Sequence, residues 1–117
     1  MSYYTEIVPF ELAKKLKEAG YPQDISDTIG YDEKGRFTSF YWQDCAAPRY
    51  AEVLDWLIDK GMCVSVYALN VSGDTMWIGH LMDISDDCKY DGSFGYKNSY
   101  DEAIAPAIEK ALELLCK

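Results

Sequence analysis

Apolar residues recur at helical spacing in three separate stretches of the chain. The first stretch is Pro9–Ala19, and Gly20 follows it as a residue suited to the left-handed end of a helix. The second runs from about Pro48 to Lys60 and is followed in the same way by Gly61. The third begins at Ser99, within a Ser-x-x-Glu sequence typical of a helix N-terminus. These patterns predict three helices.

The segments between the helices favour two β-hairpins. Residues 28–31 and 36–42 flank a turn over residues 32–35, and the second of these segments is rich in aromatic residues. Residues 62–69 and 76–84 alternate with a period of two around a turn over residues 71–74, and residues 94–96 suit a short extra strand. In residues 76–84 we expect His80, on the side that carries Met76 and Ile78, to face inward or to be half-buried, and Trp77 to point away from that side.

The element order is therefore helix, hairpin, helix, hairpin, helix. Each helix must bury its apolar stripe, and each hairpin must bury its apolar face. The sequence predicts an α+β fold of two layers, in which about three helices pack on an antiparallel or mixed sheet of about four strands. At 117 residues the whole chain, 1–117, fits a single domain.

The charge of the chain restricts its partners. Twenty acidic residues against eleven basic ones give a formal charge of −9. Direct binding to nucleic acid or to an anionic membrane needs clustered basic residues, so we expect neither. A macromolecular partner is expected to be a protein with a basic surface. The sequence predicts no signal peptide and no transmembrane helix, which makes the cytoplasm the expected location.

The sequence indicates no metal or cofactor. Cys45, Cys63, Cys88 and Cys116 are far apart, without the close pairs typical of zinc sites, and we expect them to be free, mostly buried thiols. The acidic segment around Asp87 and Asp91 superficially resembles a calcium loop. It has Lys89 at a ligand position and Asn98 where a bidentate glutamate is needed, so we do not expect it to bind calcium. Phosphate loops and nucleotide-binding fingerprints are absent from the sequence.

Catalytic candidates are few. His80 is the one histidine, and Cys45 follows Asp44 just before the second helix, where a thiolate would be favoured. A Cys45–His80 dyad is conceivable, but structural roles account for both residues more simply, and we assign no catalytic residue.

Three segments together resemble a known group of proteins. These are residues 10–20, residues 46–57 and residues 99–115. In that order they are similar to a family of small uncharacterised proteins of gut bacteria and their phages or mobile elements. The resemblance covers about two-fifths of the chain, mostly in helices, and implies an accessory-genome protein without implying an activity. Two positions depart from the family pattern: Arg49 replaces a threonine able to cap the helix, and Pro106 replaces an alanine.

Aromatic residues beside carboxylates are the remaining functional signal. Trp56 lies between the apolar stripe of the second helix and the acidic side that carries Glu52 and Asp59, and Trp77 is expected to be exposed. These four residues are the predicted binding residues, since tryptophans dominate binding hot spots. We expect a non-enzymatic protein-interaction module. The alternatives are a DNA-mimicking inhibitor of a nucleic-acid-binding protein, and a small-ligand binder or enzyme with a pocket between sheet and helices.

Overall fold

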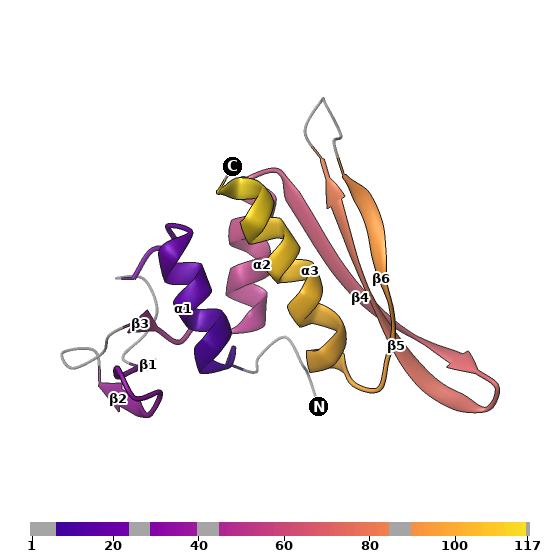
Figure 1. The fold of residues 1–117 in the computed structure, drawn as a ribbon, viewed down its shortest axis with the longest axis horizontal. Helices are drawn as coiled ribbons and strands as arrows, with labels where there is room; N and C mark the ends of the chain where they lie inside the picture. The colour runs from indigo at the N-terminus through magenta and orange to yellow at the C-terminus, as the bar shows by residue number, and fades with distance from the viewer. Residues whose placement is uncertain (1–6, 24–28, 40–44, 85–89, 117) are drawn as a thin grey trace. The chain divides into compact units, whose positions relative to one another are not determined.

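The computed structural model describes residues 7–23, 29–39, 45–84 and 90–116 (Figure 1). Within these ranges it has three helices and six strands, which confirms the α+β class. Its backbone forms two compact units, Met1–Val53 and Leu54–Lys117. Some predicted features lie outside the described residues: residue 28, residues 40–42, Asp44, and the acidic segment 85–89 that contains Asp87, Cys88 and Lys89.

The first helix, α1, covers Phe10–Glu18 in the first unit. Pro9 precedes it in an extended conformation, and Gly20 ends it with φ +96°. The Gly20 N–H donates to the Lys17 carbonyl at 3.1 Å and the Tyr21 N–H to the Leu16 carbonyl at 2.9 Å. This pair of bonds is the Schellman motif, so the predicted glycine-terminated helix is confirmed.

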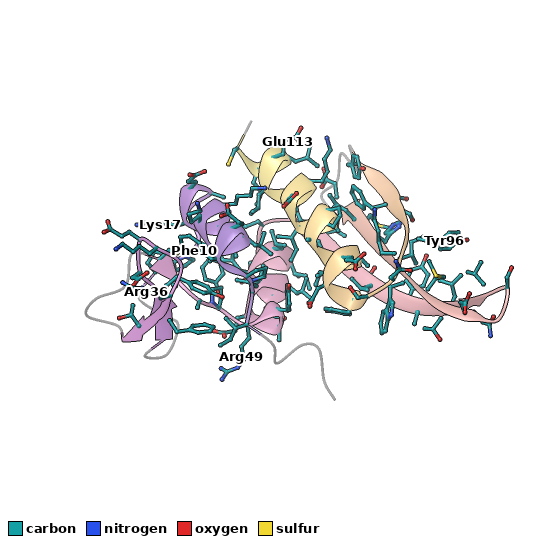
Figure 2. The ribbon with its side chains drawn as sticks, turned by 60° about the horizontal axis from the view of Figure 1, so that its bottom comes forward. Phe10, Lys17, Arg36, Arg49, Tyr96 and Glu113 are labelled. Carbon is teal, nitrogen blue, oxygen red and sulfur yellow. The ribbon has the colours of Figure 1, made fainter. Side chains whose placement is uncertain are left out.

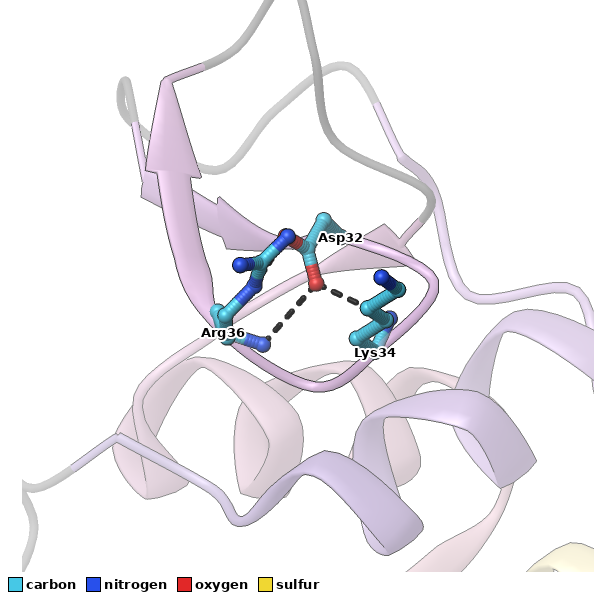
Figure 3. A network of polar contacts seen from close by, with 3 residues as sticks. All are labelled: Asp32, Lys34 and Arg36. Carbon is cyan, nitrogen blue, oxygen red and sulfur yellow. Dashed lines mark hydrogen bonds and ion pairs between the residues drawn. The ribbon is translucent and has the colours of Figure 1, made fainter.

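A three-stranded antiparallel sheet belongs to the same unit. Its strands are β1 (Ile29–Tyr31), β2 (Phe37–Ser39) and β3 (Cys45–Ala46), in the order β2-β1-β3, and α1 packs against β3. Asp32 closes the β1–β2 turn, because its Oδ1 accepts the N–H groups of Lys34 and Arg36 at 2.9 and 3.0 Å (Figure 3). The predicted turn is confirmed, whereas β3 had no signal in the sequence.

Helix α2 covers Tyr50–Asp59 and begins two residues later than predicted. The Arg49 N–H donates to Glu52 Oε1 at 3.1 Å, so the first turn is capped from inside the helix. Gly61, with φ +86°, follows the helix as expected.

The second unit has a longer antiparallel sheet. Strands β4 (Met62–Val71), β5 (Asp74–Asp83) and β6 (Asp91–Lys97) lie in that order. Ser72 and Gly73 join β4 to β5 with φ angles of +53° and +90°, the two positive values of a type I′ hairpin turn. Helix α3 (Tyr100–Leu115) packs on all three strands (Figure 1), and Ser99 Oγ accepts the Glu102 N–H at 3.2 Å, which confirms the predicted cap.

The prediction of one sheet of about four strands is wrong, because the described strands form two separate sheets. Each hairpin recruits a third strand that is close to it in the sequence: β3 pairs with β1, and β6 pairs with β5. Such short-range pairing requires the closure of only short loops, whereas joining the two hairpins would close a longer one.

The prediction that the Met76 and Ile78 side of β5 faces inward is also wrong, although His80 is half-buried as expected. The residues directed toward α3 are Trp77, Gly79, Leu81 and Asp83, and Leu81 is fully buried. A Cβ added at Gly79 would overlap the Ala103 carbonyl oxygen of α3. The absence of a side chain at this position therefore lets the helix backbone approach the strand, and this contact decides which side of β5 is covered.

Candidate functional site

The side of the β4–β5–β6 sheet turned away from α3 is rich in exposed apolar residues. We call it the outer face. It is formed by alternate residues of the three strands: Cys63, Ser65, Tyr67, Leu69, Val71, Asp74, Met76, Ile78, His80, Met82, Asp91, Ser93 and Tyr96. Tyr67 and Tyr96 remain 49% and 56% exposed, and Figure 2 shows Tyr96 projecting from the sheet away from the helix.

The strand register arranges these side chains in rows across the sheet. Ile78 lies opposite Tyr67 on one side and opposite Tyr96 on the other, which gives a tyrosine–isoleucine–tyrosine row. Directly opposite residues on one sheet face are close enough to contact each other. The row therefore offers a partner a contiguous apolar strip with two phenol groups at its ends.

The next row has a polar centre. His80 lies opposite Ser65 on β4 and Ser93 on β6. Its Nδ1 is 3.0 Å from Ser93 Oγ, and its Nε2 is 2.8 Å from Oδ1 of Asp91. Both ring nitrogens are thus engaged, and Asp91 is held in one orientation while its side chain remains 54% exposed.

The proton positions follow from the chemistry of these groups. A carboxylate only accepts, so His80 Nε2–H donates to Asp91, and in the neutral imidazole Nδ1 accepts from the Ser93 hydroxyl. The resulting Asp–His–Ser chain has the connectivity of a hydrolytic triad. It lies on the outer face, on the side of the sheet opposite α3, where the side chains of His80 and Asp91 are 26% and 54% exposed. A pocket between sheet and helix is therefore not the environment of His80. We interpret the Asp91–His80–Ser93 contacts as a polar network that orients the Asp91 carboxylate.

The predicted binding residues lie elsewhere. Trp56 is half-buried on α2, with the Lys60 ammonium 5.8 Å from the centre of its ring, and Asp59 is exposed at the end of that helix. Trp77 is on the α3 side of the sheet, where its ring meets Tyr100 edge-on at 5.9 Å.

Glu52, the fourth predicted residue, caps α2 through the Arg49 N–H. Its charge also acts on Tyr21: burial first, and then Glu52, raise the pKa of Tyr21 to about 12. Glu52 therefore stabilises the start of α2, in addition to any role in binding.

The cysteines have different environments. Cys45 is buried in β3, Cys63 is half-buried on the outer face and Cys116 is exposed at the end of α3, each as a thiol. Of these three described cysteines only Cys45 is buried, so the expectation of mostly buried thiols is wrong for Cys63 and Cys116. Burial, followed by the nearby Cys45, raises the pKa of Tyr31 above its usual value. Cys45 belongs to the first unit and His80 to the second. Among the described residues, histidine, cysteine and acidic side chains form no group of three that could hold a metal ion.

Sequence reasoning missed Tyr67, Tyr96, Asp91 and Ser93 as surface residues that lie together. The two-residue turn at Ser72 and Gly73 was a signal for part of this grouping, because it fixes the register of β4 and β5 and thereby places Tyr67 opposite Ile78.

Comparisons of the chain with protein families, with characterised proteins and with solved structures find no match. In the described part of the chain, no helix has both the length and the apolar character needed to cross a bilayer.

Proposed function

We propose that this chain is a small, acidic, non-enzymatic protein-interaction module, and that it binds a protein with a basic surface through the outer face. The observation that carries the proposal is the Tyr67–Ile78–Tyr96 row, in which both tyrosines are exposed, next to the row of His80, whose Nε2 pairs with Asp91. Aromatic residues form the energetic centre of many protein interfaces, and an oriented carboxylate adds specificity for a cationic group.

Charge supports a basic partner. From Leu54 to the C-terminus, eleven acidic and five basic residues give a formal charge of −6. On the described strands, the charged side chains of the outer face are Asp74 and Asp91, both acidic. Such a surface attracts a basic protein during diffusional encounter and repels an acidic one.

The same observations weigh against DNA mimicry. A mimic of duplex DNA needs carboxylates at regular spacing along one face, where they stand in for phosphates. On the outer face the two aspartates are separated by apolar side chains, which supports an adaptor more than a mimic. An adaptor of this kind is also in keeping with the resemblance to small accessory-genome proteins of gut bacteria and their phages.

Three single substitutions test the location of the surface. Tagged wild-type protein is used to capture partners from cell lysate with and without nuclease treatment, and a captured protein is then purified and titrated against each variant. Tyr96→Ala should weaken its binding by about 2 kcal/mol or more, roughly a 30-fold increase in Kd. Phe37→Ala is the matched control, because Phe37 is also an exposed aromatic residue, at 63%, and lies in the other unit.

Trp56→Ala separates the outer face from the site predicted on α2. If Trp56→Ala and not Tyr96→Ala abolishes binding, the interaction surface is on the helix and the outer-face proposal is wrong. Loss of capture on nuclease treatment would instead point to nucleic acid as the bridging ligand.

A further inference from the structure

The β4–β5–β6 sheet has two edges of different character. Its order leaves β4 and β6 outermost, and within the described residues β4 pairs with β5 alone. In an antiparallel pair, alternate residues direct their N–H and C=O groups toward the neighbour, so half of the ten residues of β4 direct theirs outward. An exposed row of such groups is a template for another strand.

The β6 edge has features that discourage pairing. Asp91 and Lys97 place a charge at each end, and a register shift opposite Ile78–His80 interrupts the strand beside Gly95, whose φ is +66°. Charges and bulges are the usual protection of an edge strand. Strand β4 has neither: Met62–Val71 is ten residues without a charged residue, a proline or a register shift against β5.

We propose that the outer edge of β4 pairs in antiparallel fashion with β4 of a second copy of this chain, to form a two-fold dimer with a continuous six-stranded sheet. A second copy fits because β4 is uncharged, so pairing it with itself places no like charges opposite each other despite a chain charge of −9. Because β6 is protected, each copy has one pairing edge, and the assembly closes at two copies instead of growing into a fibre.

The alternation of side chains restricts the register. Opposite residues in antiparallel strands share a face, and a two-fold axis perpendicular to the sheet keeps the outer face of both copies on the same side. The strands can therefore centre on Tyr67 opposite Tyr67 of the second copy, or on Val66 opposite Val66 of the second copy. In both registers the outer faces of the two copies become one surface.

Sedimentation equilibrium of the purified chain tests the dimer without any other partner. The expected mass is twice the chain mass of 13.3 kDa, and it should fall toward the monomer on dilution. A monomer at all concentrations, or a mass that keeps rising beyond the dimer, would overturn the proposal.

A pair of proline variants tests whether β4 provides the contact. Successive strand residues direct their N–H groups to opposite sides, so of Tyr67→Pro and Ala68→Pro one removes an outward N–H and the other an N–H paired with β5. Both residues are exposed. The variant that loses an outward N–H should keep the wild-type circular dichroism spectrum and be monomeric. If both variants keep that spectrum and both stay dimeric, pairing through β4 is refuted.

The control Tyr96→Ala alters the proposed partner surface on β6 and should leave the dimer intact. Its effect separates this inference from the proposed function, since the dimer can be present without the partner and the partner can bind a monomer. If Tyr96→Ala abolishes the dimer, the copies meet through the outer face and the proposal of edge pairing is wrong.

Discussion

Asp32 illustrates how one side chain can organise a turn. Its Oδ1 accepts two backbone N–H groups and its Oδ2 accepts Arg36 Nε–H at 3.0 Å. All of these bonds favour the charged carboxylate. The backbone N–H of Arg36 contributes most, and together with the Lys34 N–H and the Arg36 side chain it lowers the pKa of Asp32 below its usual value.

This lowered pKa predicts a pH-dependent turn. A group whose pKa is lower in the folded state stabilises that state above its unfolded pKa, and the contribution is lost as the pH falls through the folded pKa. In acid, the Lys34 and Arg36 amides should therefore lose protection against hydrogen exchange, as followed by NMR. Asp32→Asn should remove this pH dependence, whereas Glu33→Gln, at an exposed neighbour, should preserve it. Equal behaviour of the two variants would show that Asp32 does not hold the turn.

Gly79 is the residue of β5 whose type indicates which side of the strand the helix covers. A glycine inside a regular strand marks either a bulge or a close backbone approach, and here it marks the approach of α3 at Ala103. Apolar residues on both sides of β5 left its orientation ambiguous when that strand was considered alone.

At the scale of elements, the helices were the more predictable part. Their ends are determined by local residues such as Gly20, Gly61 and Ser99, each of which acts as expected. Strand pairing depends on which segments meet across a connecting loop and not on residues within one turn, so the separation into two sheets and the two-residue strand β3 had no local signal.

The orientation of β5 was nevertheless determined by the hairpin. The turn places Val71 opposite Asp74, which brings Val64 opposite Leu81 on the same face. Val64 belongs to the more apolar side of β4, so Leu81 had to be buried with it. The outer face, and with it the candidate site, could have been inferred if the two strands had been considered together.

Adjacent residues of β5 test this orientation. Leu81 is fully buried and Met82 is 37% exposed on the outer face. Leu81→Ala should lower the free energy of unfolding by about 3 kcal/mol, through lost packing and a residual cavity. Met82→Ala should cost less than about 1 kcal/mol, because little of its burial is lost. Urea denaturation measures both, and a larger loss for Met82→Ala would mean that α3 covers the other side of the sheet.

At the scale of the whole molecule, the net negative charge of the chain has opposite effects on the two proposed associations. Each chain has a formal charge of −9, so two copies repel each other at long range even though the β4 strands themselves are uncharged. A basic partner is attracted by the same field. Added salt screens both effects, and it does so most strongly for exposed charges.

The two associations should therefore respond to salt in opposite directions. Between about 0.05 M and about 0.5 M NaCl, the screening length falls from more than 10 Å to a few ångströms. Over this range the dimer, measured by sedimentation equilibrium, should become tighter, while binding of the basic partner, measured by titration, should become weaker. Asp91→Asn provides the control: it removes an exposed carboxylate from the outer face on β6, at the opposite edge of the sheet from β4. It should flatten the salt dependence of partner binding and leave that of the dimer nearly unchanged. A dimer that weakens with salt would instead be held by ion pairs, which an uncharged β4 edge cannot supply.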